Sequence, residues 1–278
     1  MKVSDVANAV IVDYHAEEAL VDCARSLQEN GIDEIVVVEN GEPGSTPTTV
    51  NFVAKVVSPG LNLGYGRGVN RGAAALSHKP LLVVTNPDVV VHPGAIATLL
   101  EYLEANPDVG IVGPTILRTD ATVYPSHRKF PNIVLAGVHA LFAPLWPSNP
   151  LTTRYRSANK DGSVDWVSGA FFVVNRDAFE KVGGFDERYF MFAEDMALCW
   201  SLAERGWKAA AVPEAVVTHV EGLSRARAPR AMIRAHHRSA LRFEVQSARG
   251  LRRALIPVAA VVLGIRFVLV SLWPKRHS

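Results

Sequence analysis

The sequence predicts an α/β fold: a mainly parallel, doubly wound sheet flanked by helices, followed by a basic and apolar helical tail. Three observations predict it. Strand-like and helix-like segments alternate over the first two-thirds of the 278 residues. Polar residues follow several strand-like segments at their carboxyl ends, where such sheets bind ligands. The charge changes sign near residue 225. We therefore predict two units, residues 1–224 and 225–278.

The elements follow in chain order. Apolar runs predict buried strands at residues 8–14, 33–40, 49–57, 80–88 and 109–117. Amphipathic segments predict helices at residues 16–31, 67–78 and 93–107. Residues 164–175 predict a strand pair, a helix begins near Glu194, and residues 208–222 close the sheet.

Residues 118–164 lack a regular pattern and contain five prolines, at positions 125, 131, 144, 147 and 150. Such a stretch is not typical of a strand or a long helix. We expect a lid or an insertion on the acceptor side of the site.

The cysteines are two, Cys23 and Cys199, and both lie in apolar helical patterns. This favours reduced thiols over a disulfide framework, and hence a reducing compartment. The first fourteen residues lack the apolar core and cleavage site of a signal peptide.

The tail is strongly basic. From Arg225 onward there are eleven arginines and one lysine against the single acid Glu244, a formal charge of +11. Because the whole chain carries +2, residues 1–224 carry −9. An acidic front and a basic tail predict two different tasks, and we expect no nucleic-acid partner.

Two patterns in the tail suggest a partner surface. Four arginines recur every four residues, which forms a stripe on a helix: Arg230, Arg234, Arg238 and Arg242. Residues 254–273 are nearly all apolar and long enough, at about 30 Å, to match a bilayer core. Pro257, Gly264 and Arg266 interrupt this stretch. It could therefore lie in the membrane face, span the membrane, or form a homodimer.

Four polar residues fall at predicted strand ends or just after them: Glu39, Asp88, Asp195 and His219. Each has an ordinary alternative explanation, as a solvated strand end, a turn, a helix cap or a partly buried histidine. Together they would meet at one edge of the sheet. Carboxylate, imidazole and a diphosphate are suitable partners for a divalent metal, Mg²⁺ or Mn²⁺.

The adjacent carboxylates Glu194 and Asp195 follow an apolar stretch and begin the last predicted helix. One interpretation is capping, since a carboxylate at a helix start accepts unpaired backbone N–H groups. The other is a general base in a half-buried pocket. Both interpretations stay open at this stage.

Residues 62–72 form a glycine-dense loop that includes Gly64, Gly66 and Gly68. Such glycines permit positive φ angles and close approach of the backbone to a ligand. The spacing is not the dinucleotide fingerprint, and it follows the third predicted strand rather than the first. This disfavours a dinucleotide-dependent oxidoreductase.

Over about residues 8–225, the chain resembles the inverting family 2 glycosyltransferases of the GT-A fold, a Rossmann-like fold, and in particular the bacterial rhamnosyltransferase-like branch. The resemblance rests on six segments in order: VIVDYHAEEALVDCARSL, VVVENG, NLGYGRGVNRGA, VVTNPDVVVHPGAI, WVSGAFFVVNRDAFEKVGGFDERYFMFAEDMALCWSLAERGW and VVTHVEGLS.

The resemblance implies a set of donor-binding residues. The positions that match the family's nucleotide-sugar segments are Asp13, Tyr14, His15, Glu39, Asn62, Gly64, Asn70, Asn86, Asp88, Trp166, Ser168 and Gly169. Glu39 stands where the family usually has Asp. The short metal motif has an Asn-Pro-Asp form with a single carboxylate.

The resemblance also implies the catalytic and metal residues. Asp195 matches the family's base and Glu194 its supporting neighbour, although Ala197 stands where relatives often have another acid. Asp88 would be the main metal ligand, completed by His219. The metal would neutralise the departing diphosphate, while Asp195 accepts the proton of an acceptor hydroxyl on the opposite face of the sugar.

The activity that the resemblance implies is transfer of a sugar, with dTDP-L-rhamnose as the expected nucleotide-sugar donor. The expected acceptor is a polyprenyl-diphosphate-linked sugar for cell-wall or surface glycan synthesis, at the cytoplasmic face of the plasma membrane. Arg230, Arg234 and Arg238 would hold the acceptor diphosphate, or else face solvent or lipid headgroups. Two alternatives are a sugar-phosphate nucleotidyltransferase and a non-catalytic membrane-bound module.

Overall fold

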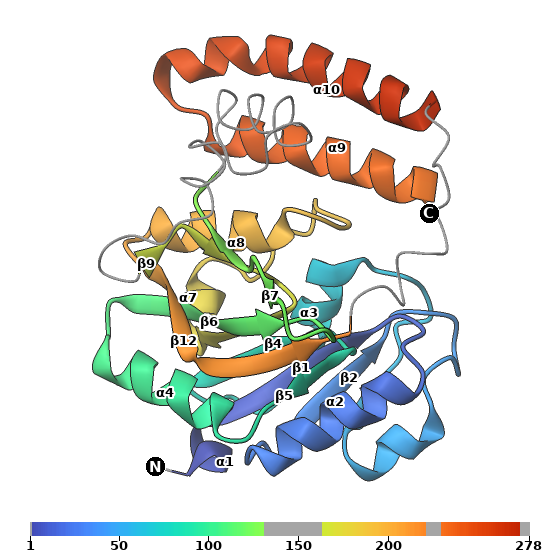
Figure 1. The fold of residues 1–278 in the computed structure, drawn as a ribbon, viewed down its shortest axis with the longest axis vertical. Helices are drawn as coiled ribbons and strands as arrows, with labels where there is room; N and C mark the ends of the chain where they lie inside the picture. The colour runs from blue at the N-terminus through green and yellow to red at the C-terminus, as the bar shows by residue number, and fades with distance from the viewer. Residues whose placement is uncertain (1, 131–162, 221–228, 273–278) are drawn as a thin grey trace.

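A computed structural model describes residues 2–130, 163–220 and 229–272 of the chain (Figure 1). Most of the irregular segment expected to form a lid or insertion lies outside the described residues. The described elements form an α/β unit with two further helices packed above it.

Ten of the described strands form one central sheet, and two form a small second sheet. The central sheet contains β1 (Ala7–Asp13), β2 (Ile35–Glu39), β3 (Lys55–Val57), β4 (Leu81–Thr85), β5 (Val89–Val91), β6 (Val109–Leu117), β7 (Val123–Tyr124), β9 (Ser163–Val164), β11 (Phe171–Asn175) and β12 (Lys208–His219). The small sheet pairs β8 (His127–Arg128) with β10 (Trp166–Val167).

Helices connect and cover these strands. They are α1 (Val3–Val6), α2 (Glu18–Glu29), α3 (Tyr65–Ala73), α4 (Ala95–Ala105), α7 (Arg176–Lys181), α8 (Glu194–Ala203), α9 (Pro229–Ser247) and α10 (Ile256–Leu272). Two 3₁₀ helices, η1 (Thr48–Phe52) and η2 (Gly250–Leu255), complete the list.

The main path of the sheet has the order β3-β2-β1-β4-β11-β6-β12-β5. The first four strands of this order, β3, β2, β1 and β4, run parallel to one another, as the sequence predicts. β6 and β12 are also parallel to each other. β11 runs antiparallel to both of its neighbours, and β5 runs antiparallel to β12. The α/β prediction is confirmed, with a parallel first half and a mixed second half. The predicted strand 49–57 is wrong in its first part, which forms η1.

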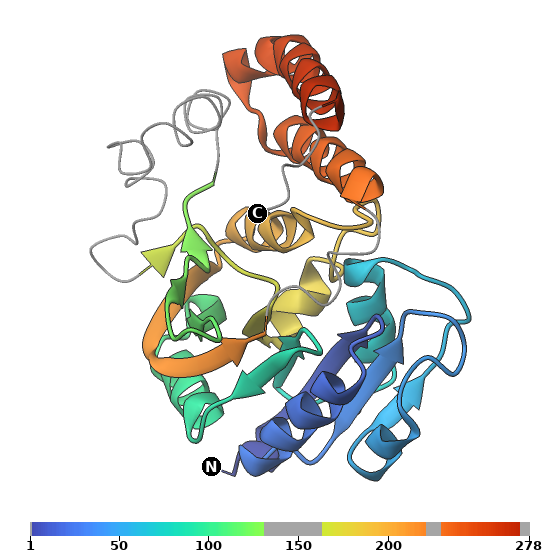
Figure 2. The same ribbon diagram turned by 45° about the vertical axis from the view of Figure 1, so that its right-hand side comes forward.

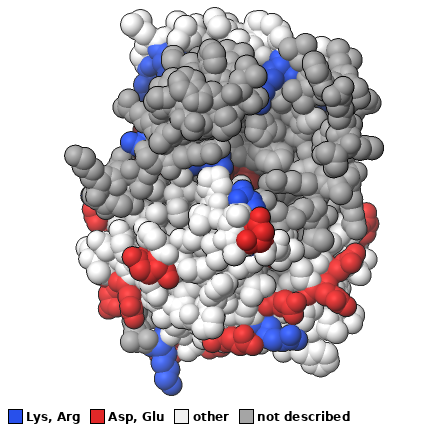
Figure 3. All heavy atoms as spheres, viewed as in Figure 1, with Lys and Arg blue, Asp and Glu red and all other residues white. Residues whose placement is uncertain are grey.

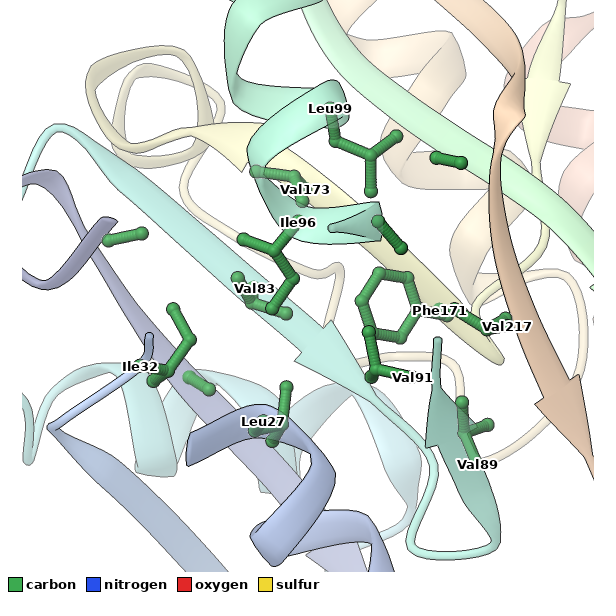
Figure 4. Packing of buried hydrophobic residues seen from close by; sticks show 14 of the residues in the cluster. Leu27, Ile32, Val83, Val89, Val91, Ile96, Leu99, Phe171, Val173 and Val217 are labelled. Carbon is green, nitrogen blue, oxygen red and sulfur yellow. The ribbon is translucent and has the colours of Figure 1, made fainter. Parts of the chain in front are cut away.

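The sheet is buried on both faces, which explains why its strands are continuous apolar runs rather than alternating ones. Successive residues of β1 and β4 enter two different clusters, one on each face. On one face, Leu27 of α2 and Ile96 and Leu99 of α4 pack toward Val83 and Phe171 (Figure 4). This packing fixes the positions of the strand ends that carry the polar residues.

Helices α9 and α10 run antiparallel, side by side, above α8 (Figures 1 and 2). Phe243 of α9 is buried in a cluster with Tyr189, Met196 and Ala197. On the face drawn in Figure 3, most of the Asp and Glu side chains lie in the lower half, while Lys and Arg side chains appear both in the upper half and at the lower edge. Among the described residues, no helix combines the length and hydropathy needed to cross a bilayer.

Candidate active site

The ends of β1 and β2 bring two predicted donor-binding carboxylates together. Asp13 and Glu39 are direct partners in the parallel register. Thr46 joins them, because its backbone N–H donates to Glu39 Oε1 at 2.9 Å and its hydroxyl donates to Asp13 Oδ2 at 2.8 Å. Burial raises the pKa of Asp13. Burial also acts on Glu39, but hydrogen bonds from Ser58 and Thr46 outweigh it and lower the pKa.

A cavity of ≈ 160 Å³ lies beside this strand edge. Its lining includes the predicted residues Tyr14 and Asn62, together with Gly41, Glu42, Pro43, Gly60 and Leu61. The third residue predicted in this region, His15, packs edge-on to Tyr14 and lies 3.0 Å from a carboxylate oxygen of Glu42. Two of the predicted nucleotide-sugar residues thus line one cavity, and their contact with a nucleoside stays a prediction.

Hydrogen bonds order the glycine-dense loop next to the cavity. The Asn40 amide donates to Asn62 Oδ1 at 3.1 Å, and the N–H of Gly64 donates to the same oxygen at 2.8 Å. Gly64 has φ +81°, and a Cβ there would lie 2.2 Å from the carbonyl oxygen of Phe190. Only glycine fits this close approach. Asn40 was not predicted, although it directly follows Glu39 at the same strand end.

Asn70 lies on α3, and its amide is engaged with the chain itself. Its Oδ1 accepts from the N–H of Phe185 and its Nδ2 donates to the carbonyl of Phe185, both at 2.9 Å. These two bonds tie α3 to the segment that leads into α8. Its predicted contact with the nucleoside stays a prediction.

The predicted metal residues meet at the ends of β4, β5 and β12. His219 pairs with Val89 across β12 and β5, which brings its Nε2 to 3.0 Å from Asp88 Oδ1. The amide of Asn86 lies 3.4 Å from the same nitrogen. Both Asp88 and His219 are buried, and His219 Nδ1 has no hydrogen-bond partner among the described atoms.

This donor set fits one side of a divalent cation site. Two ligand atoms each at ~2.1 Å from a cation, and at a right angle, are separated by ~3.0 Å, which matches the separation of Asp88 Oδ1 and His219 Nε2. No cluster of three or more His, Cys, Asp or Glu that could hold a metal occurs within residues 2–130, 163–220 and 229–272. The remaining ligands would have to come from substrate or water.

The adjacent carboxylates begin α8, as predicted. Asp195 Oδ2 accepts the N–H of Gly169 at 2.8 Å, and its Oδ1 accepts the N–H of Met196 at 2.7 Å. The N-cap is Ala193, which makes no side-chain cap. Asp195 is thus the second residue of the helix, and its carboxylate accepts one N–H of the helix's own first turn and one from Gly169.

The two carboxylates differ in their surroundings. Burial raises the pKa of Glu194 to about 8, and the charge of Asp195 adds to the rise. The Oε2 atom of Glu194 is buried without a hydrogen-bond partner among the described atoms. Burial also raises the pKa of Asp195, but two backbone N–H groups and the charge of Arg128 act against the rise. Burial thus raises the pKa of both carboxyls, and the two N–H groups and the Arg128 charge favour the ionised form of Asp195.

A short chain of backbone hydrogen bonds links the carboxylate of Asp195 to the predicted metal residues. Gly169, which donates to Asp195, precedes Ala170, whose carbonyl accepts the N–H of Asn86 at 2.8 Å. The Tyr65 hydroxyl donates to the carbonyl of Gly169.

Burial raises the pKa of the Tyr65 phenol well above its usual value. Negative charge on Glu194, Asp195 and Asp88 raises it further. The carboxylates of both predicted centres thus lie within electrostatic reach of one phenol. Tyr65 was not predicted, because the sequence shows only a tyrosine inside a glycine-rich loop.

A basic group lies next to the predicted sugar-binding segment. The Arg128 guanidinium is 5.5 Å from the centre of the Trp166 ring, a cation–π contact, and its charge reaches Asp195. The indole N–H of Trp166 donates to the carbonyl of Lys129 at 3.2 Å. Ser168 Oγ accepts the N–H of Ala170 at 3.3 Å. The sequence did not point to Arg128, which lies in an irregular segment.

Comparison with known proteins identifies the family. The family model described as "Glycosyltransferase like family 2" matches residues 4–241. The chain is 37% identical over 271 residues to the N-acetylglucosaminyl-diphospho-decaprenol L-rhamnosyltransferase of Mycobacterium tuberculosis, covering 90% of this chain and 88% of the relative. The chain belongs to the family 2 glycosyltransferases.

Further similarities agree with this assignment. The rhamnosyltransferase WbbL of Escherichia coli is 28% identical over 158 residues, which is 54% of this chain and 58% of that protein. Among solved structures, a mannosyltransferase of Pyrobaculum calidifontis in complex with GDP-Man and Mn²⁺ has a TM-score of 0.60 at 15% identity, covering 97% of this chain and 76% of that one.

A second solved structure, GalNAc-T7 with UDP, GalNAc and Mn²⁺, has a TM-score of 0.59 at 13% identity and covers 96% of this chain and 57% of that one. Both structural similarities support the predicted GT-A fold. Family membership favours the glycosyltransferase over the nucleotidyltransferase and the non-catalytic alternatives.

The arginine stripe of the glycosyltransferase is only partly described. Arg234 and Arg238 are exposed on α9, and the side chain of Arg230 lies outside the described residues. The next arginine, Arg242, is half-buried with its guanidinium 5.8 Å from the centre of the Tyr189 ring. The role of the stripe in holding an acceptor diphosphate stays a prediction, as does the boundary at residue 224.

Proposed function

We propose that the protein transfers L-rhamnose from dTDP-L-rhamnose to a polyprenyl-diphosphate-linked N-acetylglucosamine, with inversion at the anomeric carbon. The observation that carries the proposal is the 37% identity, over nearly the whole of both chains, to the N-acetylglucosaminyl-diphospho-decaprenol L-rhamnosyltransferase. The product would be a lipid-linked disaccharide for cell-wall glycan synthesis.

In this proposal Asp195 accepts the proton from the attacking acceptor hydroxyl. A general base must be ionised and within hydrogen-bond distance of its proton. The N–H groups of Gly169 and Met196 each occupy one oxygen of the carboxylate and favour its ionised form. Each oxygen keeps a second lone pair for the acceptor hydroxyl. Glu194, whose pKa burial raises to about 8, would support the site without serving as the base.

Asp88 and His219 would hold a divalent cation, Mg²⁺ or Mn²⁺. When bound, the cation would supply positive charge against the leaving diphosphate. Both side chains are buried at the strand ends, with His219 Nε2 3.0 Å from Asp88 Oδ1. Asp13, Tyr14, Glu39 and Asn62 would surround the nucleoside at the neighbouring cavity.

The tail would hold the enzyme against a membrane surface, which is where a polyprenyl-linked acceptor resides. The exposed large apolar residues of η2 and α10 recur at helical spacing. They are Leu251, Leu255, Val258, Val261, Val262, Ile265 and Val268. Exposed Arg249 and Arg253 lie at the same end of the tail. An apolar face with flanking arginines is typical of a helix lying on an anionic bilayer. The expected side is the cytoplasmic face of the plasma membrane.

The proposal is tested by incubating the purified chain with dTDP-L-rhamnose, Mn²⁺ and a synthetic polyprenyl diphosphate N-acetylglucosamine. Mass spectrometry should detect the acceptor carrying one added deoxyhexose, and NMR should show an inverted anomeric configuration. GDP-mannose in place of dTDP-L-rhamnose serves as the matched donor control. Transfer from GDP-mannose but not from dTDP-L-rhamnose would contradict the proposed donor, and a product with retained configuration would contradict the mechanism.

A further inference from the structure

The segment that leads into the catalytic helix has an unusual backbone. Phe192 and Ala193 have φ angles of +67° and +61°, and they immediately precede Glu194 and Asp195. Residues with a Cβ adopt this left-handed region at a cost of about 1–2 kcal/mol each. Two such residues in succession persist only where surrounding contacts hold them. The direction of the first turn of α8, and therefore of Asp195, depends on those contacts.

The sheet unit holds this segment from one side. The carbonyl of Phe190 accepts the N–H of Tyr65 at 3.1 Å. Tyr65 in turn donates through its hydroxyl to Gly169, whose N–H donates to Asp195. Phe190 is therefore fixed to the same framework that orients the catalytic carboxylate.

Helix α9 holds the next residue from the other side. The hydroxyl of Ser239 donates to the carbonyl of Met191 at 2.8 Å, and the Ser239 side chain is buried. Two further contacts from α9 flank this bond. The Tyr189 hydroxyl donates to Gln246 Oε1 at 2.8 Å, and the ring of Phe192 packs edge-on against another α9 side chain, His236.

We infer that Ser239 is a positioning residue for Asp195, and that α9 is thus part of the catalytic architecture as well as of the basic tail. The Ser239 hydroxyl fixes the Met191 carbonyl, which holds the two left-handed residues and aims the first turn of α8. The inference rests on the proposed function, because it assigns Asp195 the role of base. A carboxylate that shifts by a fraction of an ångström loses its alignment with the acceptor hydroxyl before it loses donor binding.

The test compares Ser239→Ala with Ser247→Ala. Ser247 lies on the same helix and is also buried, but its hydroxyl contacts Arg252 and not the segment before α8. We expect Ser239→Ala to lower kcat about tenfold, equivalent to about 1.4 kcal/mol, with KM for the nucleotide-sugar changed less than about twofold. Ser247→Ala should leave kcat near that of the unmodified chain. Ser239→Thr, which keeps the hydroxyl, should recover most of the lost kcat.

Amide hydrogen exchange tests the same bond without any turnover. Ser239→Ala should speed exchange in residues 190–197 several-fold, whereas Ser247→Ala should not. Equal exchange in this segment and equal kcat for the two alanine variants would overturn the inference, as would failure of Ser239→Thr to restore kcat. If the unmodified chain made no rhamnosylated product, the proposed function would be wrong. The exchange comparison would still decide whether Ser239 holds the segment.

Discussion

Replacing Glu194 with Gln tests whether the Glu194 carboxyl keeps its proton beside Asp195. The pKa of Glu194 is raised from 4.5 to about 8 because the carboxyl is buried beside Asp195. A pKa unit corresponds to ~1.4 kcal/mol, so ionising Glu194 in the folded protein costs at most about 5 kcal/mol. Glutamine has nearly the same shape and carries no charge at any pH, so the variant avoids this cost.

The sign of the effect follows from proton linkage. Folding raises the pKa of Glu194, so the folded state binds this proton more tightly than the unfolded state does. The stabilisation is complete below about pH 4.5 and is lost as the pH rises through about 8. Glu194→Gln and the unmodified chain should therefore have similar unfolding free energies near pH 5, and the variant should be more stable near pH 9 by about 2–5 kcal/mol.

The assay is urea unfolding followed by tryptophan fluorescence at several pH values. Glu101→Gln, an exposed position on α4, serves as the control and should follow the unmodified chain throughout. A Glu194→Gln variant that is less stable than the unmodified chain near pH 9 would refute the reasoning. That result would mean that the Glu194 carboxylate is charged and favourably paired in the folded protein.

Two further substitutions test the loop and the tail. Gly64→Ala should lower the free energy of unfolding by more than Gly44→Ala, because both glycines have φ above +80° but only a Cβ at Gly64 meets the Phe190 carbonyl, at 2.2 Å. Thermal unfolding of the two variants measures this difference. Equal losses of about 1–2 kcal/mol in both variants would contradict the clash. Ile265→Glu should reduce co-flotation of the protein with anionic lipid vesicles, whereas Phe52→Glu, also an exposed apolar position, should not. Equal flotation of both variants would reject α10 as the membrane-facing surface.

Much of the fold could be predicted from the sequence because the strands are long apolar runs separated by clear helical patterns. The exceptions have physical causes. The strand β5 is only three residues long and follows a turn, so the pattern gave no separate signal for it. The apolar residues of η1 imitate a strand, although Phe52 is almost fully exposed. The antiparallel direction of β11 depends on tertiary pairing, which no local pattern contains.

Some residues of the candidate site could likewise be predicted from the sequence, and others could not. The placement of Asp88 and His219 at strand ends and of Asp195 at a helix start could be predicted, because such side chains stand out in a sequence. Tyr65 and Ser239 could not, because their importance arises only when distant segments pack together. The tail helix α9 was predicted as a basic element, but its contact with the segment before α8 is a property of the folded chain.

The central claim is that Asp195 is the base that removes the acceptor proton. The most direct measurement compares Asp195→Asn with the unmodified chain, both for transfer from dTDP-L-rhamnose and for calorimetric binding of that donor. The account predicts a loss of kcat of about 10²–10⁴-fold with donor affinity nearly unchanged, while Glu194→Gln stays active at neutral pH. An Asp195→Asn variant whose kcat remains within about threefold of the unmodified chain would contradict the account.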